Sequence, residues 1–134
     1  PGDIVRLAMN HRGPVARGVP FIAGFVINGT APQRVLVRGI GPTLAAFRVT
    51  DALTNPTLTL FRGSTVIKSN DDWFRDPDAA LIRDTAAKSG AFALGAASLD
   101  AAMLLYLDPG AYTAQVSGAA NGTGIALIEV YDAP

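Results

Sequence analysis

The feature that most constrains the fold is a series of short alternating runs, separated by turn residues, in the second half of the chain. Residues 58–61 and 66–67 flank Arg62-Gly63-Ser64, a tight hairpin sequence. Asp108-Pro109-Gly110 places Pro and Gly where a type I or II turn needs them, and it leads into an alternating run at 111–117. A final apolar run at 124–131 follows. This pattern predicts short antiparallel strands in two layers.

The same reading over the whole chain predicts an all-β fold of about eight strands with one short helix. The expected class is a two-sheet β-sandwich or jelly roll, formed as a single domain by residues 1–134. Asn28-Gly29 and Asn121-Gly122 each separate two apolar runs, which favours hairpin turns. The expected strands cover residues 4–9, 21–28, 34–40, 57–62, 65–69, 101–107, 111–117 and 124–131.

Two segments are expected to be helical. Residues 42–47 suit a single turn after Gly41. A longer helix is expected to start with Asp76 as its N-cap and Pro77 at its first position, and to stop at Ser89-Gly90. Its apolar face would contain Leu81, Ile82 and Thr85 and cap one end of the sandwich.

Composition excludes several classes of function. The 134 residues include 11 basic and 11 acidic side chains, so the net charge is zero, which argues against nucleic-acid binding and electrostatic attachment to a membrane. There is no cysteine, hence no disulfide and no cysteine-bound metal. No apolar run is long enough to span a bilayer. Charged residues make up only 16%, where about 25% is usual. The surface is therefore unusually neutral, or another chain covers part of it.

The acidic corner at 70–78 is the best candidate for a ligand site. It combines four carboxylates with the amide of Asn70, and Ca²⁺ prefers six to eight oxygen ligands from a flexible loop. Asn70, Asp71 and Asp72 are the predicted calcium ligands. The alternative is structural: Asn70 and Asp71 form a turn, Asp76 caps the helix, and Arg75 neutralises the remaining charge.

Aromatic residues beside this corner suggest a second kind of site. Trp73 and Phe74 are candidates for stacking against a sugar, with core or rim packing as the alternative. The single histidine, His11, lies among Asn10, Arg12 and Gly13, and this composition indicates an exposed loop. No Gly-x-Ser-x-Gly motif and only one glutamate are present, so no enzyme is predicted and no catalytic residue is assigned.

Residues 58–131 resemble the bacterial pre-peptidase C-terminal family, whose relatives include the collagen-binding domains of clostridial collagenases. The shared pattern is a Leu-x-Leu-aromatic strand (58–61), an Asn-Asp-Asp corner (70–72), the sequence Leu-x-Pro-Gly-x-Tyr-x-x-x-Val (107–116) and a closing strand (126–131). Nearly the whole chain also resembles an uncharacterised domain of large secreted surface proteins of environmental bacteria. The resemblance implies a β-sandwich, secretion, a non-catalytic binding or spacer role, and calcium ligands only at Asn70, Asp71 and Asp72. The helix at 76–90 departs from the family pattern.

Two functions follow from these observations. The first is an extracellular or cell-surface structural module that binds copies of itself, such as a subunit of a bacterial filament or sheath. Residues 4–9, or the last strand, would complete the sheet of a neighbour by β-strand addition. The alternative is an adhesion module of a secreted enzyme, which binds a polysaccharide or a matrix protein and is stabilised by calcium.

Overall fold

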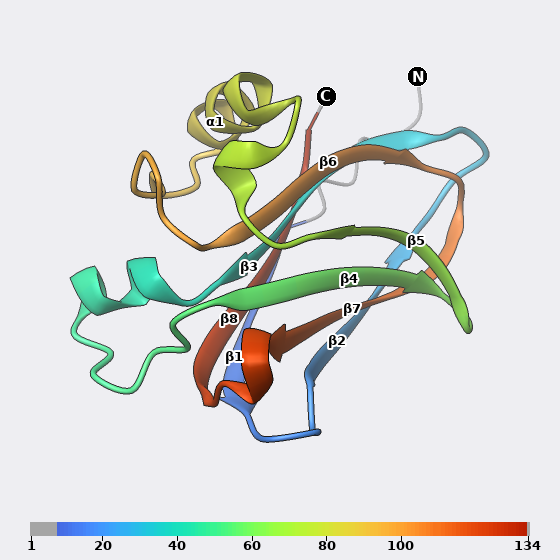
Figure 1. Ribbon diagram of the computed structural model, residues 1–134. Coiled ribbons are helices and arrows are strands. Elements are labelled where there is room, and N and C mark those ends of the chain that lie inside the picture. Colours follow the sequence, from blue (N-terminus) through green and yellow to red (C-terminus); the bar gives the residue numbers. More distant parts are fainter. Residues whose placement is uncertain (1–7, 134) are drawn as a thin grey trace.

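The computed structural model describes residues 8–133, which form a β-sandwich of two four-stranded antiparallel sheets (Figure 1). The first sheet, called here the β1 sheet, has the order β1-β8-β3-β6, and the β2 sheet has the order β2-β7-β4-β5. The predicted fold class is confirmed. The strands are β1 (Ala8–Val15), β2 (Phe21–Ile27), β3 (Gln33–Ile40), β4 (Pro56–Arg62), β5 (Thr65–Asn70), β6 (Ala101–Leu107), β7 (Gly110–Gly118) and β8 (Gly124–Asp132).

The main core lies between the two sheets and follows from the alternation along each strand. On β4, Leu58 and Leu60 point inward and are fully buried, while the alternating Thr57 and Thr59 are only half-buried. On β7, Tyr112, Ala114 and Val116 do the same. Since successive side chains of a strand point to opposite faces, this pattern fixes which face of each sheet meets the other.

Only one of the expected hairpins pairs adjacent strands within a sheet. Gly63, with φ of 61°, turns β4 directly into its antiparallel partner β5. The two Asn-Gly hairpins were wrong predictions. Asn28-Gly29 joins β2 to β3, and Asn121-Gly122 joins β7 to β8, and in both cases the two strands belong to different sheets. A turn sequence sets the local backbone, but the long-range pairing decides which strands become neighbours.

Strand β1 corrects the interpretation of His11. Residues 10–13 were expected to form a loop, yet they lie in the middle of β1, where His11 faces Ile128 of β8 in the register. His11 is exposed, as predicted. Pairing with a strand more than 100 residues away overrides the loop-like composition of this segment. Of the strand expected at 4–9, residues 4–7 lie outside the described residues.

Helix α1 (Ala79–Lys88) starts later than predicted. The N-cap is Asp78 and not Asp76 as predicted. The Asp76 carboxylate accepts the backbone N–H of Asp78 at 2.8 Å and so orders the turn that precedes the helix. Ser89-Gly90 ends the helix as expected, with Gly90 at φ of 79°. Leu81 was wrongly placed on the packed face, because it is 45% exposed, whereas Ile82 and Thr85 are buried. No helix of the described chain has the length and apolar character needed to cross a membrane.

Helix α1 and the segment that follows it cover the outer face of the β1 sheet. A second apolar cluster fills this space, formed by Leu36, Trp73, Ile82, Ala86, Ala102 and Leu104. The β1 sheet is therefore packed on both faces, while no segment of residues 8–133 covers the outer face of the β2 sheet in this way (Figure 1). This asymmetry determines where the molecule meets its surroundings.

Three short 3-10 helices complete the structure, of which Ala119–Asn121 lies between β7 and β8. Residues 42–47 form the expected turn, a 3-10 helix (Pro42–Phe47) after Gly41. Another 3-10 turn, Trp73–Arg75, follows the acidic corner and leads towards α1.

Candidate functional site

The corner at Asn70–Trp73 attaches the end of β5 to the edge of β6. The Asn70 side-chain carbonyl accepts the N–H of Ala102 at 3.0 Å, and the N–H of Trp73 donates to the carbonyl of Asp100 at 2.9 Å. The Asn70 amide also donates to the carbonyl of Asp72 at 3.4 Å. The corner thus satisfies backbone groups at the beginning of an edge strand, which is one way that proteins protect a sheet edge.

The two adjacent carboxylates of the corner have different surroundings. Asp72 Oδ2 lies 3.3 Å from Nε of Arg75, whereas Asp72 Oδ1 is buried without a hydrogen-bond partner. Asp71 is exposed. Partial desolvation, and then the charge of Asp72, raise the pKa of Asp71 above its ordinary value, while Arg75 acts in the opposite direction.

The arrangement is a poor match for a calcium cage. The amide oxygen of Asn70 and one oxygen of Asp72 already have partners, which leaves Asp71 and Asp72 Oδ1 to hold an ion. In residues 8–133, no three His, Asp or Glu side chains converge into a metal-binding group. Because Ca²⁺ needs six or more oxygens, most of them would have to come from water or from rearranged backbone.

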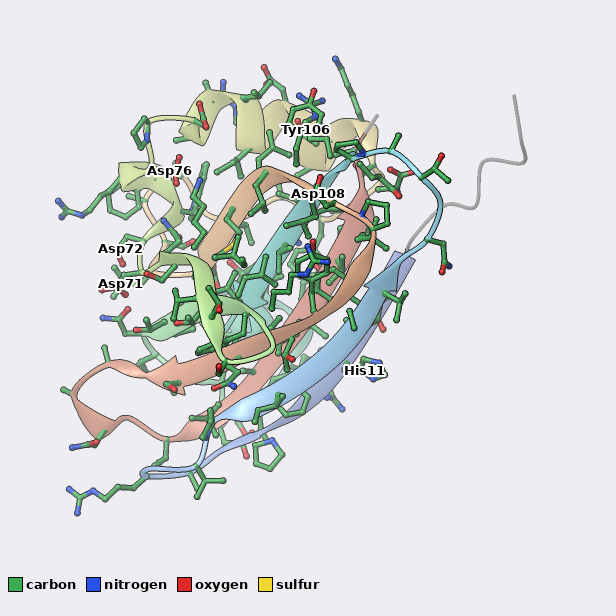
Figure 2. The ribbon with its side chains drawn as sticks, turned by 90° about the vertical axis from the view of Figure 1, so that its right-hand side faces the viewer. His11, Asp71, Asp72, Asp76, Tyr106 and Asp108 are labelled. Carbon is green, nitrogen blue, oxygen red and sulfur yellow. The ribbon has the colours of Figure 1, made fainter. Side chains whose placement is uncertain are left out.

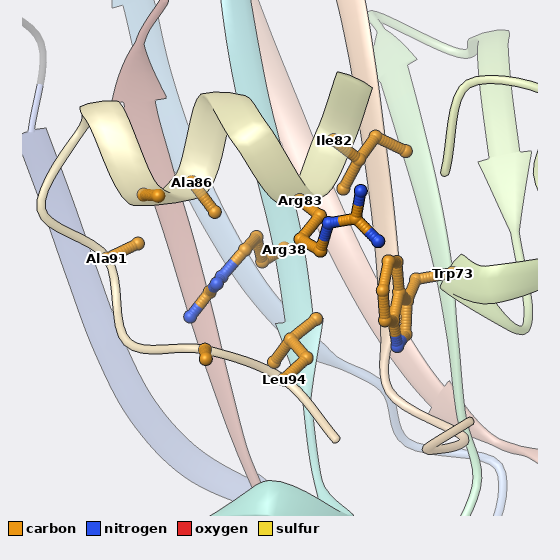
Figure 3. A pocket seen from close by; sticks show the side chains of 9 residues that line it. Arg38, Trp73, Ile82, Arg83, Ala86, Ala91 and Leu94 are labelled. Atoms are coloured by element: carbon orange, nitrogen blue, oxygen red, sulfur yellow. The ribbon is translucent and has the colours of Figure 1, made fainter. Parts of the chain in front are cut away.

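Trp73 lies in the core beneath α1. It is 5% exposed, and its indole N–H is shared between the Gly95 carbonyl and the Ser98 hydroxyl, both at 3.2 Å. Phe74 is half-buried below the Arg75 guanidinium. Trp73 also forms one wall of a mostly apolar pocket of about 110 Å³ under the helix, opposite Ala86 and Leu94 (Figure 3). Trp73 and Phe74 therefore do not form a flat exposed platform for a sugar ring.

The floor of this pocket contains a buried ion pair that the sequence did not reveal. Arg38 is 0% exposed, and its Nε donates to Glu129 Oε1 at 2.8 Å, with Nη2 equally close but without hydrogen-bond geometry. Nη1 donates to the Phe92 carbonyl, and the Phe92 ring lies 4.6 Å below the guanidinium. The hydroxyl of Tyr131 donates to the other oxygen of Glu129 at 2.7 Å. Burial, and then this hydrogen bond and the Glu129 charge, raise the pKa of Tyr131 to about 12.

Asp100 is the second buried polar group that sequence reasoning missed. Its carboxylate accepts the N–H of Gly41 at 2.8 Å and the hydroxyl of Ser98 at 2.7 Å, together with the hydroxyl and N–H of Thr43. It therefore holds the turn after β3 against the start of β6. The only sequence signal for this role was an aspartate directly before an apolar strand, and aspartates are common in such loops.

The predicted residues do not form a common reactive centre. Figure 2 shows Asp71, Asp72 and Asp76 together on one side of the molecule and His11 at the opposite edge. The buried carboxylates of Asp100 and Glu129 are occupied by structural donors. The hydroxyls of Ser98 and Thr43 that reach Asp100 belong to the same structural contacts, which hold the turn after β3.

The outward positions of the β2 sheet carry no charged side chain. The register aligns Ile22, Gln115, Thr59 and Ser69 in one row across the sheet, and Gly24, Thr113, Phe61 and Val66 in the next. The remaining outward positions are Val26, Ala111, Thr57 and Ser117. Several of the apolar side chains are well exposed: Ile22 is 50%, Val26 54% and Val66 56% accessible.

Comparison with solved structures confirms the resemblance of the fold. The structure is similar to the 1.0 Å crystal structure of the pre-peptidase C-terminal domain of a collagenase from Bacillus anthracis, with a TM-score of 0.53 and 12% sequence identity. The match covers 92% of this chain and 89% of that domain. No family model and no curated protein matches the sequence.

Proposed function

We propose that this chain is a non-catalytic module of a secreted protein, located outside the cell or on its surface, that binds copies of itself by β-strand addition. The likeness of the fold to an accessory domain of a collagenase supports the non-catalytic and extracellular part. So does the use of the buried ionisable groups, Arg38, Asp100 and Glu129, as partners in structural contacts.

The main support for self-association is the free edge of β2, which lies at the margin of its sheet. The other edges are protected. The Asn70–Trp73 corner covers the start of β6, and a register shift between Leu60 and Phe61 interrupts the pairing of β5, which also carries Lys68. On β1, Arg12 and Pro14 reduce the capacity for pairing. By contrast, β2 is seven residues long, has neither charge nor proline, and pairs only with β7 within residues 8–133.

An edge of this kind accepts a strand from another chain because its unpaired N–H and C=O groups gain partners there. Ile22 and Val26 extend the same strand onto the uncharged outer face, so a second copy would approach without desolvating a charge. Pairing of β2 with β2 of a second copy would close as a dimer, so a filament or sheath also requires a donor segment, such as the strand expected at residues 4–9. The last strand cannot be the donor in this arrangement, since β8 lies between β1 and β3 inside its own sheet.

The experiment is light scattering with size-exclusion chromatography over a wide concentration range, followed by negative-stain electron microscopy. We expect concentration-dependent oligomers or fibres for the natural chain and monomers for Ile22→Lys and Val26→Lys. Val66→Lys is the matched control, because Val66 is equally exposed on the opposite edge of the same sheet. A natural chain that stays monomeric and dispersed at every concentration would refute the proposal.

The unpartnered Oδ1 of Asp72 supports a second candidate, a calcium-stabilised module that binds a polysaccharide or a matrix protein near Trp73 and Phe74. It predicts a higher melting temperature in millimolar CaCl₂ than in EDTA, and a change of Trp73 fluorescence with one ligand from a panel of polysaccharides and collagen. Identical melting curves and an unchanged emission spectrum would exclude this candidate.

A further inference from the structure

A second and larger pocket of about 320 Å³ lies apart from the acidic corner and from α1. It is bordered by Arg12 of β1, by Arg48, Thr50 and Asp51 after the 3-10 helix, and by Ile125 at the start of β8. Its volume is at the lower end of the range found for small-molecule sites, about 300–1,000 Å³. Neither the self-association nor the calcium candidate makes use of it.

The base of this pocket is fixed by backbone contacts. The N–H of Ile125 donates to the carbonyl of Asp51, and the N–H of Leu53 donates to the carbonyl of Ile125, both at 2.8 Å. Gly13, also in the wall, is buried where a Cβ atom would collide with the ring of Phe21. The wall segments therefore hold their positions before any ligand arrives, which lowers the entropic cost of binding.

The two arginines of the pocket are exposed and are available to a ligand. In the described part of the chain, the side chains of Arg12 and Arg48 have neither an ion pair nor a hydrogen bond, whereas Arg38, Arg75 and Arg83 all have carboxylate partners. Arg48 also has a left-handed backbone, with φ of 66°, held by the bond from its N–H to Ala45 and by the adjacent bond from Val49 to Leu44. Arg48 is the left-handed C-cap of the 3-10 helix, and this cap fixes the backbone from which its side chain extends.

The chemistry of the four polar groups selects a ligand. Guanidinium groups bind a carboxylate through paired hydrogen bonds. The Asp51 carboxylate and the Thr50 hydroxyl accept hydrogen bonds from hydroxyl groups, and the negative charge of Asp51 disfavours multiply charged anions such as phosphate. We propose that this pocket binds one uronic acid residue of an acidic polysaccharide, with Arg12 and Arg48 on its carboxylate and Asp51 and Thr50 on its ring hydroxyls.

Non-specific attraction is a weak competing explanation, because the chain has no net charge to draw in a polyanion. The proposal does not rest on self-association, and a monomeric chain would bind in the same way. Its failure would therefore leave the strand-addition experiment unaffected.

The test is isothermal titration of the natural chain with short oligogalacturonate at low ionic strength. We expect measurable binding, a loss of at least about tenfold in affinity for Arg12→Gln and for Arg48→Asn, and weaker binding as salt increases. Asparagine tolerates the left-handed backbone, so Arg48→Asn removes the charge without disturbing the turn. Arg17→Gln is the matched control, because Arg17 is exposed and also without a partner but lies outside the pocket.

Two further probes separate the alternatives. The methyl ester of the same oligomer keeps the sugar and removes the carboxylate charge, so it should not bind. Poly-glutamate presents carboxylates without sugar, so it should bind at least tenfold more weakly. No binding of oligogalacturonate, an equal loss with Arg17→Gln, or equal affinity for the ester or for poly-glutamate would overturn the proposal.

Discussion

The buried pair of Arg38 and Glu129 provides the sharpest test of how this fold is stabilised. Glu129→Gln keeps the shape of the side chain but leaves the Arg38 guanidinium, which is 0% exposed, without its counter-charge. Removing one partner of a buried ion pair costs about 3–5 kcal/mol. Unfolding entropy scales as about 2.1 cal/mol/K per residue, so for 134 residues each kcal/mol shifts the melting temperature by about 3–4 °C. The expected decrease is therefore about 10–18 °C.

Differential scanning calorimetry at pH 7 measures this decrease, and a double variant completes the argument. Arg38→Met combined with Glu129→Leu removes both charges, and well-packed apolar replacements of buried pairs are often neutral or stabilising. The double variant leaves the Phe92 carbonyl and the Tyr131 hydroxyl without partners, which reduces this gain. We expect it to be more stable than Glu129→Gln. A decrease below about 3 °C for Glu129→Gln, or a double variant less stable than Glu129→Gln, would refute the reasoning.

Three further predictions concern the other polar groups. Asp100→Ala leaves the donors of Gly41, Thr43 and Ser98 unpaired, so chemical denaturation should show a loss of about 3–5 kcal/mol. Since the pKa of Tyr131 is raised to about 12 from 10.0, the natural chain should lose stability as the pH rises from 10 to 12, and Tyr131→Phe should lose less over this window in thermal melts. The raised pKa of Asp71 means that its ionisation destabilises the fold, so Asp71→Asn should melt at a higher temperature at pH 7, with the difference vanishing below the ordinary pKa of 3.8.

The strands were predictable because their signal is local. Alternation in 58–61 and 111–117 and an apolar run at 101–107 define β4, β7 and β6 within one residue at most sites, and Gly63 marks the hairpin. The 3-10 turn at 42–47 was predicted with the same bounds. The sequence did not predict most of β1, because Asn10, His11 and Gly13 have a loop-like composition. Only pairing with β8 makes this segment a strand. The two Asn-Gly turns were misinterpreted for the same reason, because the turn sequence does not reveal that the strands it joins belong to different sheets.

For the candidate sites, too, the sequence predicted local features but not contacts between distant residues. The sequence placed Asn70, Asp71 and Asp72 at one corner, but it could not show that Asn70 binds the backbone of β6 or that Trp73 lies under α1. The Arg38–Glu129 pair joins residues 91 positions apart, and Arg12 and Arg48 line one pocket only because β1 and the loop after the 3-10 helix border it together. Contacts of this range leave no periodic trace in the chain.

By itself, the sequence determined that this chain forms short strands, where most of them lie, and that its surface carries little charge. These properties depend on backbone preference and on side-chain alternation between neighbours in sequence. Only the tertiary structure decided which strands are edges, which sheet α1 covers, and which polar groups are buried as partners. Each of these depends on burial against distant residues, and burial exists only once the two sheets and the helix have packed together.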